Sequence, residues 1–146
     1  MNSQSHIRST ARSLPIALLR ARETVMAPIR DMLQDIRLTE QKWRILRVLD
    51  ELGEVEQSAI AHEACLLLPS VTRILRAMEA DGQIVRRKDK EDKRRTMVRI
   101  TDAGRMILEN NLATSSAISS NIEAQMGREK LDQLLDLLEE LQNVKV

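Results

Sequence analysis

The chain has 146 residues, a length that fits one domain with a sizeable core, and its formal net charge is only +1. It contains one cysteine and one tryptophan, with no phenylalanine or tyrosine. The single cysteine excludes an intramolecular disulfide and fits a reducing cytosol. The scarcity of aromatic residues disfavours modules that stack single-stranded bases on aromatic platforms. No stretch is long enough to span a membrane, so we expect a soluble cytoplasmic protein.

The first predicted element is a long helix over residues 14–36. Apolar residues recur there at helical spacing, from Leu18 through Val25 and Ile29 to Ile36. Pro28 lies inside this pattern. Because proline lacks the N–H that a helix interior needs, the helix should be kinked or split at this position.

A second helix should begin at Thr39, which can cap it, and end at Gly53. Its apolar stripe consists of Ile45, Val48, Leu49 and Leu52, while Trp43 and Leu46 lie off the stripe, which indicates a helix buried on more than one side. Residues 54–57 predict a short strand that pairs with a later hairpin. Residues 58–64 predict a compact helix capped by Ser58, and residues 65–68 then form a turn.

The next helix has two distinct faces. Pro69 suits its first turn, and Gly82 supplies a left-handed stop. At about 100° per residue, an aliphatic stripe and a polar face separate: the stripe is Val71, Ile74, Leu75 and Met78, and the opposite face carries Thr72, Arg73, Arg76 and Ala80. Hydroxyl and guanidinium groups can read base edges in a DNA major groove. The alternative is a surface helix whose two arginines are merely solvated.

A strongly basic hairpin follows that helix. Residues 82–99 contain eight Lys or Arg and three acidic residues. Strand patterns begin at Ile84–Val85 and end at Val98–Ile100, which leaves residues 89–95 as the tip. Charge runs are usually solvated loops. Directly after a candidate recognition helix, however, this hairpin favours phosphate contact and insertion of arginine into a minor groove.

The C-terminal part predicts two more helices and a second subunit. Thr101 should cap a long helix that reaches Ile122, and Gly127 separates it from a last helix. A leucine stripe runs along the last helix: Leu131, Leu134, Leu135, Leu138 and Leu141. The central lobe would cover only part of this apolar surface, so we expect a homodimer through the terminal helices. The alternative is a monomer whose last helix folds back.

Three segments in this order, LTEQKWRILRVL, ACLLLPSVTRILRAMEADG and EDKRRTMVRITDAG, make the chain similar to the MarR family of bacterial winged-helix regulators. The runs LPIALLRARE, LTEQKWRI and ACLLLPSVTRIL resemble the branch that controls homoprotocatechuate catabolism. The resemblance covers nearly the whole chain after Leu14. It implies a mainly α fold with a small β wing, in one domain over residues 1–146. The winged helix-turn-helix lobe would span about 38–101, with dimerisation helices at about 12–36 and 102–146.

The resemblance also implies how the chain would hold DNA. Arg94 would enter the minor groove, and Asp92 would brace the wing through nearby arginines. Ser70, Thr72, Arg73 and Arg76 map onto the major-groove helix, and Lys93 and Arg95 belong to the basic wing. A homodimer would bind a pseudo-palindromic operator in double-stranded DNA, with its reader helices about one helical turn apart.

Members of this family usually release DNA when a small phenolic acid binds between the dimerisation helices and the DNA-binding lobe. An acid in a mainly apolar pocket needs an arginine partner. The candidates for this site are Arg22, Trp43 and Arg47, with Arg20 and Arg44 as further arginines. For Arg22 the alternative is a surface or inter-subunit salt bridge, and for Trp43 it is a place in the core.

Other chemistry is weakly supported. His62 and Cys65 lie three residues apart, but two ligands make a poor metal site, and His6 is expected in a terminal tail. Cys65 could sense oxidants, although its apolar neighbours favour a buried structural thiol. No nucleophile–base pair, cofactor motif or metal motif is present, so an enzyme is not expected. The sequence therefore favours a repressor released by a phenolic acid, with a Cys65 redox switch or a winged protein-interaction module as alternatives.

Overall fold

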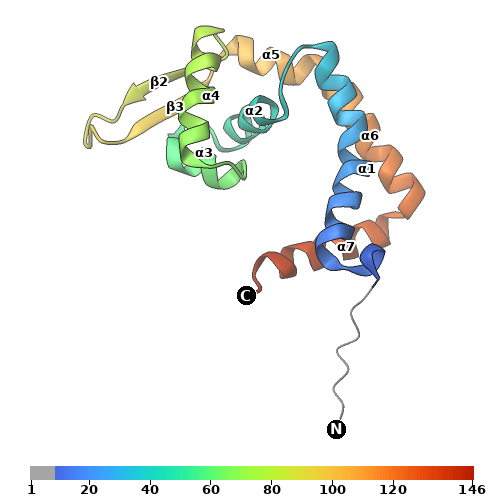
Figure 1. Ribbon diagram of the computed structural model, residues 1–146. Helices are drawn as coiled ribbons and strands as arrows, with labels where there is room; N and C mark the ends of the chain where they lie inside the picture. The colour runs from blue at the N-terminus through green and yellow to red at the C-terminus, as the bar shows by residue number, and fades with distance from the viewer. Residues whose placement is uncertain (1–8) are drawn as a thin grey trace. The chain divides into compact units, whose positions relative to one another are not determined.

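The computed structural model describes residues 9–146, so His6 lies outside the described residues. The chain folds as two compact units that divide between Glu40 and Gln41, close to the predicted start of the lobe. The first unit holds the short 3-10 helix η1 (Thr10–Arg12) and the long helix α1 (Leu14–Asp35) (Figure 1). None of the helices within residues 9–146 combines the length and apolarity that a membrane span requires.

Helix α1 is one continuous helix of 22 residues. It starts with Pro15 in its first turn, where a missing N–H is left without a partner anyway. Pro28 lies inside the helix without dividing it, so the predicted split is wrong. One proline removes a single hydrogen bond, and the turns on both sides of Pro28 keep theirs. Only Met32 and Leu33 of this helix are buried.

The second unit begins within α2 (Glu40–Leu52) and continues through β1 (Val55–Glu56), α3 (Gln57–Glu63), α4 (Leu68–Ala80), β2 (Ile84–Lys88) and β3 (Thr96–Ile100). The side chains that close its core come from all of these elements except β1, and the most completely buried are Ile45, Leu46, Leu49, Ile60, Val71, Leu75, Met78, Ile84 and Val98. Trp43 is buried as well, whereas Leu52 is exposed although it continues the predicted stripe. Helix α2 is therefore buried on more than one side, as its sequence predicts.

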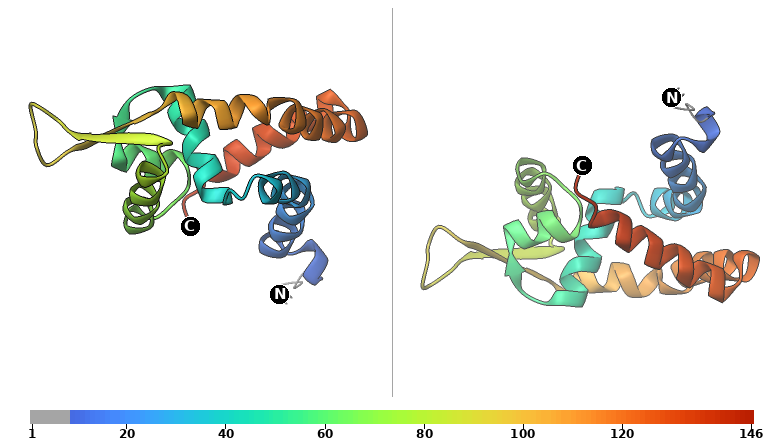
Figure 2. Two further views of the ribbon diagram at one scale, coloured as in Figure 1. Left: turned by 90° about the horizontal axis from the view of Figure 1, so that it is seen from above. Right: turned by 90° about the horizontal axis from the view of Figure 1, so that it is seen from below.

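The three strands form an antiparallel sheet in the order β1-β3-β2. Val98 in the central strand pairs with Val55 on one side and with Arg86 on the other. The β2–β3 hairpin extends away from helices α2–α4 in all three ribbon views (Figures 1 and 2). Strand β1 runs directly into α3, so the residue that precedes this helix is Glu56, and the prediction of Ser58 as its cap is wrong.

The junction of β3 with the next helix is tightly fixed. The Thr101 hydroxyl accepts a hydrogen bond from the Gly104 N–H at 3.1 Å and donates to the Gly82 carbonyl at 2.6 Å. A Cβ atom at residue 104 would lie 2.3 Å from the Gln83 carbonyl oxygen, so only glycine fits there. Gly82 itself adopts a φ of +75°, which ends α4 as its sequence predicts.

The predicted long helix after Thr101 is two helices, α5 (Asp102–Asn110) and α6 (Leu112–Met126). The break falls at Asn111, whose side-chain amide donates to the Ile107 carbonyl at 2.8 Å, while its backbone N–H bonds to Leu108. The side chain therefore takes the acceptor that a continuing helix would offer to the backbone. Gly127, with a φ of +87°, then leads into α7 (Arg128–Gln142). Neither α6 nor α7 contains a buried residue.

Candidate nucleic-acid interface and effector cavity

Helix α4 has the two faces that its sequence predicts. Val71, Leu75 and Met78 are buried, and Ile74 is half-buried. Arg73 and Arg76 are exposed on the other side of the helix. The buried face anchors the helix in the lobe, so the two guanidinium groups stand on a fixed support and are open to solvent. Ser70 and Thr72 are half-buried at the edge of this surface.

Thr72 is held by a residue that sequence reasoning did not single out. Gln57, the first residue of α3, donates from its side-chain amide to the Thr72 hydroxyl at 2.5 Å. The Thr72 hydroxyl in turn donates to the Leu68 carbonyl at 3.2 Å. This contact spans the helix-turn-helix. No spacing rule links residues 57 and 72, so only the packing of α3 on α4 reveals it.

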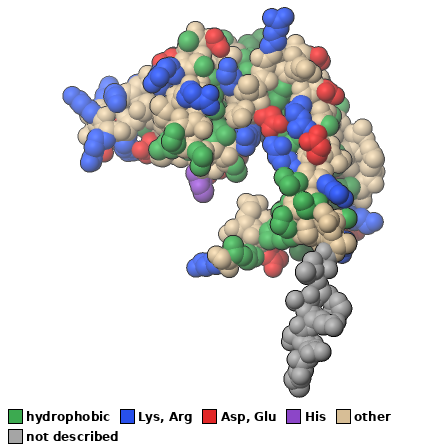
Figure 3. Space-filling model, viewed as in Figure 1, with side chains coloured by type: hydrophobic (Ala, Val, Ile, Leu, Met, Phe, Trp, Pro, Cys, Tyr) green, Lys and Arg blue, Asp and Glu red, His purple; other side chains and the backbone are tan. Residues whose placement is uncertain are grey.

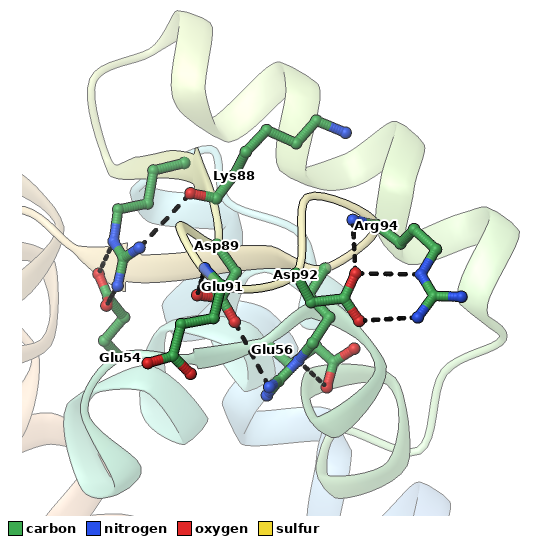
Figure 4. A network of polar contacts seen from close by, with 9 residues as sticks. Glu54, Glu56, Lys88, Asp89, Glu91, Asp92 and Arg94 are labelled. Atoms are coloured by element: carbon green, nitrogen blue, oxygen red, sulfur yellow. Dashed lines mark hydrogen bonds and ion pairs between the residues drawn. The ribbon is translucent and has the colours of Figure 1, made fainter.

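The hairpin tip is organised by Asp92. Its carboxylate accepts two hydrogen bonds from the Arg94 guanidinium, at 3.0 and 3.2 Å, and one from the Arg94 backbone N–H at 3.1 Å (Figure 4). The side-chain bonds first, and then the backbone bond, lower the pKa of Asp92 below its ordinary value. The Arg94 side chain nevertheless remains 90% exposed, so it is oriented without being covered.

Arg95 is tied to two carboxylates. Its guanidinium lies 3.2 Å from Glu56 of β1 and 3.4 Å from Asp89 at the end of β2 (Figure 4). A second ion pair joins Arg87 of β2 to Glu54 at 2.5 Å. The hydrogen bond from Arg87 lowers the pKa of Glu54. Two ion pairs thus join the wing to residues 54 and 56, one just before β1 and one within it. The charge count of the hairpin alone could not reveal these pairs, because Glu54 lies 33 residues before Arg87 and Glu56 lies 39 residues before Arg95.

A third ion pair connects the wing to helix α4, the candidate recognition helix, which we call the reader helix. Glu79 of α4 accepts hydrogen bonds from the Arg86 guanidinium at 3.0 Å and from the Arg86 backbone N–H at 2.8 Å. These bonds, the side-chain one first, lower the pKa of Glu79. Although part of the positive charge is neutralised in this way, lysine and arginine side chains still gather over the hairpin (Figure 3). Lys93 and Arg94 at the tip are both exposed.

A cavity of about 810 Å³ lies in the second unit between α2 and the α5–α6 pair. It brings together two of the predicted ligand residues, Trp43 and Arg47, which lie one helical turn apart on α2. The remaining lining residues are Asp50, Glu51, Leu108, Leu112, Ser115, Ser116, Ser119 and Ser120. Asp50 also pairs with Arg105 at 3.5 Å. Among the lining residues, Arg47 is the cation.

The other candidate arginines have separate surroundings. Arg22 bonds to Glu40 at 2.7 Å within the first unit and does not line this cavity, so the salt bridge considered as its alternative is present. Arg44 donates to the Ala64 carbonyl at 2.9 Å, which turns its guanidinium toward the loop between α3 and α4. Arg20 is exposed. The part of Arg22 in ligand binding stays a prediction.

The comparison with known proteins is decisive for the family. The sequence model of the MarR family matches residues 38–96. The homoprotocatechuate degradative operon repressor of Escherichia coli is 41% identical over 128 residues, which cover 88% of this chain and 86% of the repressor. The chain belongs to the MarR family. Its fold is accordingly a winged helix-turn-helix, with long helices before and after the lobe in the sequence.

Two solved MarR-like structures add detail. NadR in complex with 4-hydroxyphenylacetate is 36% identical, has a TM-score of 0.83, and is matched over 99% of this chain and 100% of NadR. CouR bound to a 23-mer DNA duplex is 26% identical, has a TM-score of 0.82, and is matched over 91% of this chain and 94% of CouR.

The expectation that the Cys65 thiol of this MarR-family chain is buried is wrong. Cys65 is exposed rather than buried. It adopts a left-handed φ of +55° in the turn after α3, which directs the side chain away from the core that its leucine neighbours suggested. Within residues 9–146, no three His, Cys, Asp or Glu side chains are grouped so as to hold a metal ion.

Proposed function

We propose that this chain is a dimeric, sequence-specific transcriptional repressor that a small phenolic acid releases from its operator. One observation carries the proposal: a reader helix with exposed arginines and a wing tipped by an oriented, exposed Arg94 lie on the same lobe. The similarity to the E. coli repressor and to DNA-bound CouR supports it. An operator-binding protein acts where the DNA is, so we propose a cytoplasmic location.

The proposed DNA contacts divide between two grooves. Helix α4 would enter the major groove and present Ser70, Thr72, Arg73 and Arg76. The wing would follow the backbone into the minor groove through Lys93, Arg94 and Arg95. On helix α4, arginine can pair with guanine edges in the major groove. On the wing, arginine is attracted by the negative potential of a narrow minor groove. Because Arg95 is tied to two acids, its larger contribution would be to hold the wing.

The proposed dimer uses apolar surface that one chain does not bury. Helices α6 and α7 have no buried residue, although α7 carries the leucine stripe. We therefore propose dimerisation segments at about 12–36 and 102–146, around a DNA-binding lobe at about 38–101. Pairing across a two-fold axis would bury the stripe and set the spacing of the two reader helices.

The proposed effector site is the cavity that contains Trp43 and Arg47. A guanidinium can bind a carboxylate through two parallel hydrogen bonds, and the indole can pack against an aromatic ring. NadR, a solved relative, is in complex with 4-hydroxyphenylacetate. The chain has no phenylalanine or tyrosine, so the indole, leucine and serine side chains of the cavity would form the rest of the ligand surface.

The test is a mobility shift with DNA from upstream of the protein's own gene, challenged with a panel of hydroxylated aromatic acids. We expect salt-dependent binding that one of these acids reverses. Trp43 is the only tryptophan, so its fluorescence should report the same acid directly. Arg47→Ala should lose the ligand response and keep DNA binding, whereas Arg128→Ala on α7 should keep both. Absence of any salt-dependent binding would favour a protein-interaction module instead.

A second candidate function follows from the exposure of Cys65. An accessible thiol can be oxidised, and this one lies in the turn that precedes the reader helix. In this alternative, peroxide rather than a phenolic acid releases the operator. Cys65→Ser should then remain bound to DNA under peroxide. If the serine variant is released like the wild type, the redox function is excluded.

A further inference from the structure

We propose that the junction of β1 and α3, Glu56–Gln57, positions both DNA-reading surfaces, and that Gln57 is a positioning residue that determines what Thr72 presents to the operator. The inference rests on the proposed DNA binding and deepens it. It assigns to these two residues a part in sequence recognition, although neither lies on the reader helix or on the wing.

The first step is the hydrogen bonding of Thr72. A threonine hydroxyl has one hydrogen to donate and two lone pairs. The hydrogen goes to the Leu68 carbonyl at 3.2 Å, and one lone pair accepts from the Gln57 amide at 2.5 Å. The Thr72 hydroxyl therefore cannot donate to a base. It can offer its methyl group, which suits the methyl group of thymine, and one lone pair, which suits the amino group of adenine or cytosine.

The second step is the direction of the side chain. The bond to the Leu68 carbonyl lies within α4, and the bond from Gln57 adds a partner from α3, so the χ1 angle of Thr72 is set in part from outside its own helix. Without Gln57, the β-branched side chain could exchange between the two rotamers that threonine adopts in helices. A base contact that needs one rotamer would then be weakened, although the helix itself would stay in place.

The third step links this contact to the wing. Glu56, the neighbour of Gln57, forms an ion pair with Arg95 at 3.2 Å and pairs with Met97 of β3. Two consecutive residues thus hold the reader helix through Thr72 and the wing through Arg95. Strand β1 passes directly into α3, so no flexible loop separates the two contacts. The junction should make the two reading surfaces move as one body when they dock on DNA.

The experiment compares Gln57→Met, Thr72→Val and the double variant for binding to the operator and to a scrambled duplex at the same salt concentration. Methionine keeps the length of the side chain and suits a helix, but cannot donate. The matched control is Gln41→Met on α2, an exposed glutamine of the same lobe that lies on neither reading surface and outside the proposed dimerisation segments. Thermal unfolding of every variant checks the fold.

We expect Gln57→Met to weaken operator binding about threefold to tenfold, the range that corresponds to one hydrogen bond, with unchanged binding to the scrambled duplex. Thr72→Val should behave alike, and the double variant should be no worse than either single one. The Gln41 control should match wild type. If Gln57→Met does not fold, Thr72→Val tests the same bond from its other partner.

Two results would overturn the inference. Equal weakening on both duplexes would mean that Gln57 contacts the DNA backbone directly. Additive losses in the double variant would mean that Gln57 and Thr72 act independently. Failure of the proposed function looks different, because the wild-type chain itself would then bind neither duplex. Thr72→Ser adds a final discrimination: it keeps the hydroxyl, so any loss of operator affinity reports the methyl contact.

Discussion

The winged lobe and the helices that follow it differ in how much of their apolar surface they bury. Thirteen of the fifteen buried apolar residues within 9–146 lie between Trp43 and Ile100. Helices α6 and α7 have none, and the leucines of α7 include Leu134, Leu135 and Leu137, all exposed. Both regions are rich in aliphatic residues, so composition does not explain the contrast.

The contrast indicates where each region finds its stability. The lobe closes its core with side chains from three helices and two strands of the same chain, so its fold does not depend on a partner. The leucine stripe of α7 has no such counterpart, and an uncovered stripe of this length is costly in water. The lobe thus buries its core by itself, whereas helices α6 and α7 leave apolar side chains exposed that the proposed second subunit would cover. Four changes test this division.

The largest effect should come from the core of the lobe. Leu75 is completely buried, so Leu75→Ala should lower the free energy of unfolding by about 2–5 kcal/mol, through lost burial and the cavity left behind. Urea denaturation followed by Trp43 fluorescence measures this. Leu67→Ala, at a leucine that is 76% exposed in the same lobe, is the control and should change little. A small effect at Leu75 would contradict a core completed within one chain.

The next effect should come from the leucine stripe. Leu135 is 55% exposed, and Leu135→Asp would place a charge in the proposed dimer interface. We expect a monomer by sedimentation and about 100-fold weaker operator binding, because each lobe would then hold only one half-site. The fluorescence of Trp43 should be unchanged. Leu52→Asp, at an exposed leucine of α2, should leave the dimer intact; a dimeric Leu135→Asp protein would place the interface elsewhere.

A smaller effect is expected at the wing. Arg94→Ala should weaken operator binding about tenfold and lower the slope of affinity against salt by about one, because one cationic contact is lost. Titrations at several salt concentrations measure both quantities. Arg128→Ala on α7 removes the same charge far from the wing in sequence and should alter neither. Operator binding by the Arg94 variant that equals wild type would show that the wing does not read DNA.

Local signals predicted the lobe well. The apolar stripe of α4, the glycine stop at Gly82 and the Thr101 cap are each set by a few neighbouring residues, and all three are confirmed. The pairing of β1 with the hairpin was also predicted, since only one strand-like run precedes the wing. For the same reason, the separation of α4 into a buried and an exposed face follows directly from its sequence.

The remaining features do not follow from the pattern of residue types along the chain. The turn at Cys65 takes a left-handed conformation that no composition rule requires, so the thiol is exposed against expectation. Asn111 breaks a helix through its own side chain, in a segment that otherwise continues the helical pattern. Trp43 and Arg47 were identified, but the serines opposite them lie about seventy residues away, and only the fold brings them to the same cavity.

The smallest effect should follow from pH, through the carboxylates that fasten the wing. Arginine hydrogen bonds lower the pKa of Glu79, Glu54 and Asp92, so each group has a lower pKa in the folded state than in the unfolded chain. Their stabilisation is therefore complete above the unfolded pKa, about 4 for these side chains, and is lost as pH falls through the folded value. The melting temperature of the lobe should stay constant from pH 7 to about pH 5 and should decrease below about pH 4.

Glu79→Gln identifies the contribution of the tie between α4 and β2. The variant keeps an acceptor for Arg86 but cannot titrate, so its melting temperature should be slightly lower than that of wild type at pH 7 and should fall less steeply below about pH 4. Melting curves of both proteins between pH 3 and pH 7 measure the difference. Because the ion pair is partly exposed, solvent screens it, and the effect stays small beside that of Leu75→Ala. If the melting temperatures of the two proteins fall equally with pH, this ion pair does not stabilise the lobe, and its apolar core alone holds it together. The contrast with helices α6 and α7, which bury no residue, would then be larger.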